Sequence, residues 1–177
     1  MEAEALTTLV EAVLVRAWRR DSTIHGEYHW RCVSATGLAL APCVRGVDPT
    51  LVFCFGLLHD TRRVNDAVDP GHGLRAASLA RELRAAGVLD LDDHRFTLLC
   101  SALSDHSNGL VSDEPTTGTC WDADRLHLPR VLIRPLPELF STDAARSSAA
   151  LTAAESLRAA GPASWETLVA SLGHADT

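Results

Sequence analysis

Apolar residues recur at steps of three and four along most of the chain, which is the spacing that lines one face of an α-helix. The pattern predicts helices at about 6–17, 27–40, 49–60, 70–87, 92–106, 121–128, 143–160 and 164–173. Strand signals are weak. The expected fold is therefore all-α, a single compact bundle of about seven helices formed by residues 1–177.

Prolines, glycines and short polar side chains mark the boundaries of these helices. Asp48-Pro49 and Asp69-Pro70 each combine a capping carboxylate with a proline suited to the first helical turn. Gly87 stands where a helix C-terminal glycine is expected. The pattern predicts a loop at 115–119, a brief extended segment at 131–133 and a proline-rich hinge at 129–137.

Composition narrows the class of protein. The 177 residues are 46% hydrophobic and carry a formal net charge of −7, as in many soluble globules. The longest apolar run, 51–58, is too short to cross a membrane, and the N-terminus has no basic leader, so we expect a cytoplasmic protein. Five scattered cysteines without a CxxC pair favour reduced thiols.

Charge and basic-residue usage exclude several functions. The acidic balance argues against strong nucleic-acid binding, which needs clustered cations. The sequence contains no lysine, and all 16 basic residues are arginine. A P-loop, a Schiff-base enzyme and a protein kinase each need a lysine, so these classes are excluded.

The eight histidines fall into two sets. Three lie in polar surroundings and are expected to be exposed: His94, His127 and His174. Five lie at predicted helix ends: His25, His29, His59, His72 and His106. We expect the tryptophans and cysteines beside the second set to be core residues: Trp30, Trp121, Cys32 and Cys120.

The His59-Asp60 pair is the most informative of these positions, because it ends a wholly apolar segment. A buried carboxylate is costly unless it has a partner, and a divalent cation is a suitable one. His29 and the acidic residues of 121–126 are the natural additional ligands. Imidazole and carboxylate ligands suit Mn, Fe, Co, Ni or Zn rather than calcium.

The order of these residues resembles the HD-domain superfamily of metal-dependent phosphohydrolases. His29 lies four residues before Val33, His59-Asp60 follows an apolar helix, and 123–126 reads Ala-Asp-Arg-Leu, as in the closing motif of that family. The resemblance covers about 21–142, with 143–177 as a helical extension. Within it, 22–30, 59–77 and 116–128 resemble an uncharacterised bacterial branch.

The resemblance implies His29, His59, Asp60 and Asp124 as metal ligands, with Asp124 favoured over Asp122. Adding His72 and His106 completes the ligand order of two-metal members, in which the Asp of the His-Asp pair bridges the ions. One or two metals per chain are therefore expected. As an alternative, each added histidine could be a helix-end residue that only forms hydrogen bonds.

The sequence departs from several nucleotide-cleaving relatives after the His-Asp pair, because Arg63 stands where they carry an acidic residue. Arg62 or Arg63 could bind phosphate, although Arg62 is better explained as part of a solvated arginine pair or by a structural ion pair with Asp66 or Asp69. Arg125 could contact substrate or brace the neighbouring aspartates. His25, one turn before His29, could bind substrate or reach the metal.

These residues predict hydrolysis of a small phosphorylated molecule, a phosphoester or nucleotide, by a metal-activated water. Asp60 or Asp66 could act as general base, and Arg63 could stabilise the phosphoryl oxygens. Two alternatives remain open: a mixed-valent di-iron oxygenase of the same superfamily, and a non-catalytic ligand-binding domain. The Ala-rich helix at 143–160 could be a cover or a homo-oligomer contact.

Overall fold

The computed structural model describes residues 1–173, and in this range every regular element is helical. The all-α prediction is confirmed. The elements are α1 (Ala3–Arg16), α2 (Glu27–Leu40), η1 (Ala41–Cys43), α3 (Pro49–Leu58), α4 (His72–Ala85), α5 (Asp93–Asp105), α6 (Pro115–Arg125), η2 (Leu128–Val131), η3 (Pro137–Leu139), α7 (Asp143–Arg146), α8 (Ser148–Ala160) and α9 (Trp165–Leu172).

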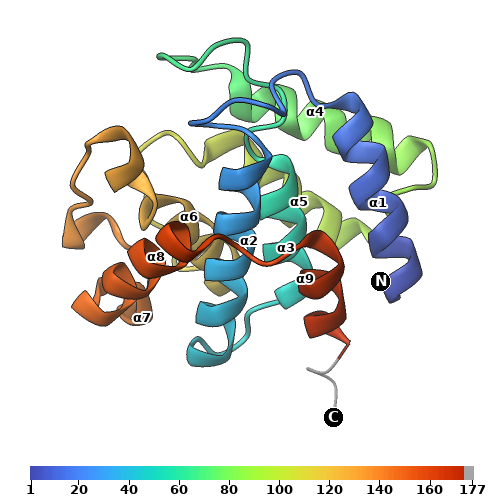
Figure 1. The fold of residues 1–177 in the computed structure, drawn as a ribbon. Helices are drawn as coiled ribbons and strands as arrows, with labels where there is room; N and C mark the ends of the chain where they lie inside the picture. Colours follow the sequence, from blue (N-terminus) through green and yellow to red (C-terminus); the bar gives the residue numbers. More distant parts are fainter. Residues whose placement is uncertain (174–177) are drawn as a thin grey trace.

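Helix α3 lies in the middle of the bundle, with α2 and α5 beside it (Figure 1). Its start is set as the sequence predicts, with Pro49 in the first turn and the Asp48 carboxylate accepting a hydrogen bond from the Leu51 amide. All eight residues from 51 to 58 are buried. A helix that is apolar on every side must be surrounded, and α1, α2, α4, α5 and α6 all contact it.

Helices α2 and α3 pack closely because each has a glycine at the contact. A Cβ atom at Gly56 would lie 2.2 Å from the Ser34 Oγ atom, and one at Gly37 would lie 2.4 Å from a Val52 methyl group. The two backbones can therefore approach to a distance that no larger residue would allow. This contact brings the N-terminal turn of α2 next to the residues that follow α3.

The C-terminal segment joins two parts of the molecule. Helices α7 and α8 form a small second cluster with Leu40, Leu126 and Phe140. Helix α9 returns to α1, and Trp165, Leu168 and Val169 belong to the main core. In Figure 1 the chain crosses in front of α2 and α3 between these two positions.

Several predicted boundaries are wrong. Residues 115–119 form the first turn of α6, because the Glu114 carboxylate caps the amides of Thr116 and Thr117. The single helix predicted at 143–160 is broken at Ser147, whose hydroxyl caps the second part. Residues 131–133 are not extended, since η2 ends at Val131 and Leu132 has a φ of 61°.

The start predicted at Asp69-Pro70 is also displaced, because α4 begins at His72. The Asp69 carboxylate accepts hydrogen bonds from Arg75 and the Val64 amide and does not cap the helix. Gly87 has the expected left-handed conformation, with a φ of 71°.

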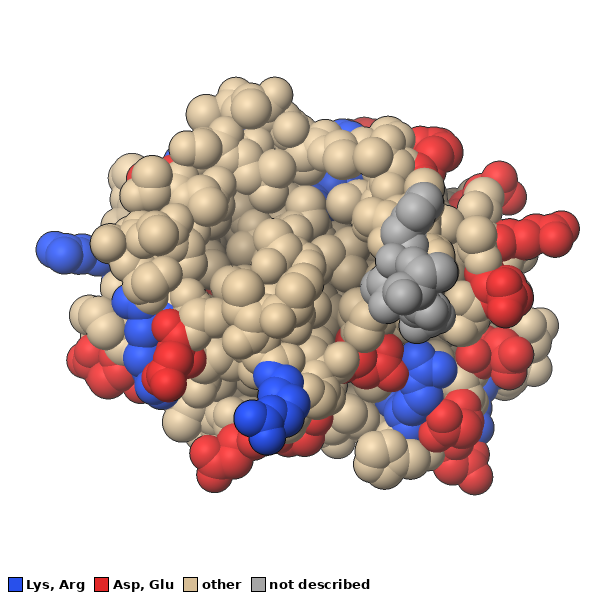
Figure 2. Space-filling view, turned by 90° about the horizontal axis from the view of Figure 1, so that it is seen from below, with Lys and Arg blue, Asp and Glu red and all other residues tan. Residues whose placement is uncertain are grey.

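None of the helices within residues 1–173 is long and apolar enough to cross a lipid bilayer. Figure 2 shows the face of the molecule seen from below in Figure 1, with charged side chains around its margin and an uncharged, hollowed middle. On this face the basic side chains lie singly or beside acidic ones. The face therefore shows no continuous basic stripe.

Candidate metal centre

The turn before α2 positions the first two histidines. The Ser22 hydroxyl accepts hydrogen bonds from the backbone amides of Ile24 and His25. Gly26 has no room for a side chain, since a Cβ atom there would lie 2.3 Å from the Arg20 carbonyl oxygen. This tight turn places His25 one helical turn before His29, so both rings face the end of α3.

His59 and Asp60 leave the end of α3 and point into the same space. The His59 Nδ1 atom lies 3.0 Å from the Gly56 carbonyl oxygen. A carbonyl can only accept, so Nδ1 carries the proton and the Nε2 lone pair is free. That lone pair faces His29, whose Nε2 atom lies 3.2 Å away.

Helix α6 adds a carboxylate to this pair. The Asp124 Oδ1 atom lies 3.2 Å from His29 Nε2 and 3.8 Å from His59 Nε2. Asp122 has a different role, because its oxygens accept hydrogen bonds from the backbone of Ser141 and from Thr142. We call His29, His59 and Asp124 the Asp124 group; its atoms lie close enough together to hold a metal ion.

A second set of donors meets on the other side of Asp60. His72, at the start of α4, and His106, after α5, have their Nε2 atoms 2.7 Å apart. Each ring donates its Nδ1 proton to a backbone carbonyl, that of Asp69 and that of Leu103 respectively. Helices α4 and α5 touch at Gly73, where a Cβ atom would lie 2.4 Å from the Leu103 carbonyl oxygen.

Asp60 lies between the two sets. Its Oδ1 atom is 3.3 Å from His72 Nε2 and 3.9 Å from His106 Nε2. We call Asp60, His72 and His106 the His106 group, which also has the spacing needed to hold a metal ion. The other oxygen, Oδ2, lies 3.6 Å from His59 Nε2 and 3.7 Å from His29 Nε2, so one carboxylate faces both groups.

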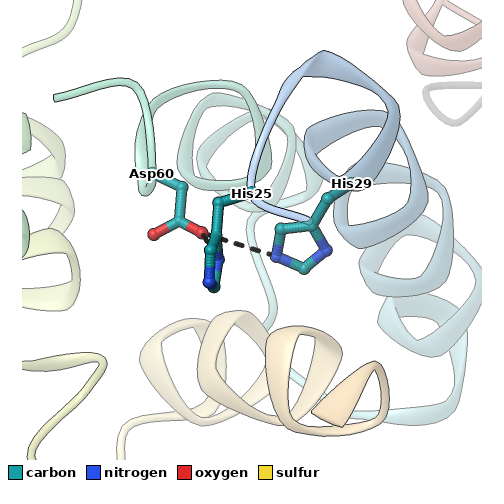
Figure 3. Close-up of side chains that lie close together, drawn as sticks. All are labelled: His25, His29 and Asp60. Carbon is teal, nitrogen blue, oxygen red and sulfur yellow. Dashed lines mark hydrogen bonds and ion pairs between the residues drawn. The ribbon is translucent and has the colours of Figure 1, made fainter. Parts of the chain in front are cut away.

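His25 also approaches the Oδ2 atom of Asp60. Its Nδ1 atom lies 2.9 Å from Asp60 Oδ2. Figure 3 shows the imidazoles of His25 and His29 and the Asp60 carboxylate turned toward one another. These three side chains form a third group with metal-ligand spacing, overlapping the other two.

Burial gives the donors the protonation states that a metal requires. Burial lowers the pKa of His29, with Arg130 adding to the effect, and it lowers the pKa of His106, with His59 adding to it. Burial alone would raise the pKa of Asp124, but His29, His59 and Arg130 hold that pKa well below its usual value. The imidazoles of His29 and His106 are therefore neutral, and the Asp124 carboxylate is ionised, near neutral pH.

The facing imidazole nitrogens are the strongest sign that this cluster could hold a cation. In the His106 group both Nδ1 protons are directed at carbonyl oxygens, so two unprotonated Nε2 atoms face each other, and like acceptors repel without a positive charge between them. His29 Nδ1 and Asp124 Oδ1 are buried and have no hydrogen-bond partner within the described part of the chain. Buried polar atoms without partners are costly, and a bound cation would remove that cost at Asp124.

Comparisons with models of protein families, with curated proteins and with solved structures each found no match.

Two arginines approach the cluster. Arg63 Nη1 lies 3.4 Å from Asp60 Oδ1 and 3.3 Å from both ring nitrogens of His72. Arg130 lies 4.0 Å from Asp60 Oδ2 and 3.9 Å from Asp124 Oδ1. Sequence reasoning missed Arg130, because it stands in a proline-rich connection; its position six residues after Asp124 was the only available signal.

Arg62 does not reach the site. Its guanidinium lies over the Trp18 ring, 4.8 Å from the centroid, and pairs with Glu82 at 3.3 Å. The predicted ion pair with Asp66 or Asp69 is wrong, because Arg19 and Arg75 occupy those two carboxylates: Arg19–Asp66 and Arg75–Asp69, each at 2.5 Å.

Asp66 lines the pocket above the cluster, but Arg19 and the Ser22 hydroxyl engage its two oxygens. The Ser22 hydrogen bond and Arg19 lower its pKa. A carboxylate held in this way is a weak base. Burial alone would raise the pKa of Asp60, but His59, His25 and His29 hold that pKa well below its usual value too, so these pKa shifts favour neither carboxylate as the general base.

Arg125 is expected from the sequence either to contact substrate or to brace the neighbouring aspartates. It does not brace the aspartates, because its guanidinium donates to the carbonyl oxygens of Leu139 and Leu110. It thereby ties the 128–139 segment to the loop after α5. It also lines the pocket edge.

The prediction that His127 is exposed is wrong. Its side chain is 1% exposed, and its Nε2 atom lies 2.8 Å from the Thr36 hydroxyl. Helical spacing puts it one turn after Asp124, so its ring lies beside that of His29, with centroids 6.1 Å apart. His94 is exposed as predicted, and His174 lies outside the described residues.

The remaining core predictions are confirmed, since Trp30, Trp121, Cys32 and Cys120 are all buried. Burial raises the pKa of Cys32 to about 11. A thiol of that kind is a poor metal ligand or nucleophile at neutral pH.

Proposed function

We propose that this chain is an HD-type, metal-dependent phosphohydrolase that cleaves a small phosphoester. The observation that carries the proposal is the position of Asp60, whose two oxygens face two sets of imidazole Nε2 atoms. His29, His59, Asp60 and Asp124 would hold one divalent transition metal. Asp60, His72 and His106 would hold a second.

Such metals supply Lewis-acid chemistry, lowering the pKa of water toward neutrality and polarising a phosphoryl oxygen. Side chains of the protein would supply phosphate binding and proton transfer. Arg63 and Arg130 carry fixed positive charge beside Asp60, on the side that opens to the pocket, where they can bind phosphoryl oxygens. Arg130 is held in place by hydrogen bonds to the carbonyl oxygens of Ile24 and His127.

His25 is the best placed residue for proton transfer to a leaving group. It lines the pocket, its side chain is 11% exposed, and its Nδ1 atom lies 2.9 Å from Asp60. Asp60 orients the ring, as a carboxylate commonly does for an imidazole. His25 therefore connects the buried cluster with the part of the pocket that substrate can enter.

Elemental analysis of protein purified without chelator, together with phosphate release from a panel of phosphoesters, tests this proposal. We expect bound Mn, Fe, Co, Ni or Zn and metal-dependent phosphate release. Added metal should also raise the melting temperature, because it binds only the native state. Protein that neither contains nor binds metal would instead favour a non-catalytic ligand-binding domain.

A mixed-valent di-iron oxygenase is the second candidate. It is favoured by the same arrangement, because Asp60 lies among five further donor residues, His29, His59, His72, His106 and Asp124. The two candidates differ in their products. Oxygen uptake coupled to oxidation of a substrate C–H bond, with about two irons per chain, would establish the oxygenase in place of the hydrolase.

A further inference from the structure

A pocket of about 500 Å³ opens above the metal-ligand cluster. Its floor is polar and includes His25, Asp60, Arg63, Asp124 and Arg130. This volume fits a small organic molecule. The arginines of the floor can bind a phosphate group, so the walls of the pocket determine which organic group the phosphate carries.

One wall is built entirely from aliphatic side chains of the segment that follows α6. The residues are Leu128, Val131, Ile133, Leu136 and Leu139. Val68 also lines the pocket, from the 64–69 turn before α4. Several of these side chains are open to solvent, with exposed fractions of 53% for Ile133, 49% for Leu136 and 89% for Val68.

Hydrogen bonds hold the backbone of this wall in one conformation. Arg125 donates hydrogen bonds to the carbonyl oxygens of Leu139 and Leu110. Two further backbone bonds close the η2 turn, from Leu132 to Pro129 and from Ile133 to Leu128. The aliphatic residues are therefore held over the floor by specific contacts.

The chemistry of the lining argues against a nucleotide. Among the described residues that line this pocket there is no Phe, Tyr or Trp on which a base could stack, and no Asn or Gln amide to read its edge. Proteins stack bases on aromatic rings, histidine or arginine and read base edges by hydrogen bonds. Here His72 and His106 face each other, and the guanidinium of Arg125 donates to backbone carbonyl oxygens. Exposed aliphatic carbons instead favour an apolar group, which gains free energy when it covers them.

We propose that the pocket takes a phosphoester whose organic part is an aliphatic chain. The phosphate lies at the floor beside Arg63 and Arg130, and the chain lies along the 128–139 wall. This inference rests on the proposed function for its phosphate, but the wall can be tested separately. It replaces the broader expectation of a phosphoester or nucleotide with one class of molecule.

The test is calorimetric titration of Mn²⁺-loaded protein with methyl-, butyl- and hexylphosphonate, and with AMP. We expect affinity to rise by about threefold per added methylene, as for a partly buried chain. AMP should bind more weakly than hexylphosphonate. Hexanoate and butyrate form a second series, which reports on the wall without a phosphoryl group.

Leu136→Asn should abolish the dependence on chain length, because it removes apolar surface without adding a charge that would repel the phosphonate. Leu132→Asn is the matched control, since Leu132 is 97% exposed and does not line the pocket. Its φ of 61° also suits asparagine. This variant should behave as the unchanged protein does.

The outcomes separate the two proposals. Affinity that is independent of chain length, or tighter binding of AMP, would overturn the aliphatic assignment and leave the phosphohydrolase intact. Carboxylates that show the chain-length dependence, in protein that binds metal but no phosphonate, would keep the wall and remove the phosphoester function.

Discussion

The two sides of Asp60 differ in charge although they share an architecture. On one side the Asp124 group offers two imidazoles and a second carboxylate, with Arg130 about 4 Å away. On the other, the His106 group has no carboxylate besides Asp60 itself, and Arg63 lies 3.3 Å from His72. A divalent cation is favoured by negative ligands and opposed by nearby positive charge.

The difference indicates an order of metal binding. The Asp124 group should bind the first ion tightly, and the His106 group should bind a second more weakly. Arg63 can therefore have two roles, binding phosphate when the second ion is present and partly neutralising Asp60 when it is absent. Three of the following predictions test this asymmetry, and one tests the neutral form of a histidine buried beside the Asp124 group.

The largest effect is expected for His59→Ala, which removes a donor of the stronger group. Metal content should fall sharply and kcat/KM should drop by roughly a thousandfold, because the Lewis acid contributes several kcal/mol. Elemental analysis and phosphate release measure both. The matched control is His94→Ala, an exposed histidine outside the cluster; if it lost as much metal, the assignment would fail.

His106→Ala should remove only the second ion. The metal-to-protein ratio should fall from about two to about one, with an activity loss of roughly a hundredfold, smaller than for His59. Titration of metal-free protein with Mn²⁺ should show the tight phase unchanged and the weak phase gone. Loss of the tight phase would reverse the proposed order of affinity.

Acid should destabilise the metal-free protein through histidines buried in neutral form. Burial lowers the pKa of His127 to about 4, whereas an unfolded histidine titrates near 6.5. As pH falls below 6.5 the unfolded chain binds a proton that the native chain does not, so stability present at pH 7 is lost toward pH 4. Between pH 7 and 5 this residue alone should cost about 2 kcal/mol.

Urea unfolding at pH 7 and pH 5, in metal-free buffer, measures that loss. His127→Gln places an amide near the position of the Nε2 atom that meets Thr36, but it cannot titrate, so the loss of unfolding free energy between pH 7 and pH 5 should be smaller by about 2 kcal/mol. His94→Gln changes an exposed histidine and should retain the full loss. If the free energy of unfolding depended on pH equally in all three proteins, His127 would titrate as an ordinary exposed histidine.

The smallest effect is expected for Arg63→Met. Removing the positive charge beside His72 should tighten binding of the second ion by about tenfold, since a nearby unit charge in partly screened surroundings is worth roughly 1–2 kcal/mol. Arg62→Met removes the neighbouring charge, which pairs with Glu82 away from the cluster, and should have little effect. Weaker binding in Arg63→Met would show that the arginine supports the His106 group.

Much of this arrangement was predictable, because helix boundaries and ligand order are local signals. Asp48-Pro49 and the apolar run after it determine where His59 and Asp60 emerge. The start of α6 was missed because glutamate caps it in place of the aspartate seen at Asp48. The break in the Ala-rich segment depends on one serine, which is common inside helices and carries little information by itself.

Other features depend on tertiary contacts. His127 and Arg130 look like ordinary polar residues of a loop until the fold places them beside His29 and Asp60. The pairing of Asp66 with Arg19 joins residues 47 positions apart, which no periodicity encodes. The aliphatic wall was likewise hidden, because its residues lie in a segment without regular spacing.

The backbone contact at Gly73 has a consequence for comparing relatives of this chain. Because α4 and α5 touch there without an intervening side chain, even a methyl group would push His72 away from His106. A related protein could therefore keep all six donors and still lose its second ion through a change at a residue that binds nothing. Surveys that infer chemistry from an intact ligand set should also require glycine at this position.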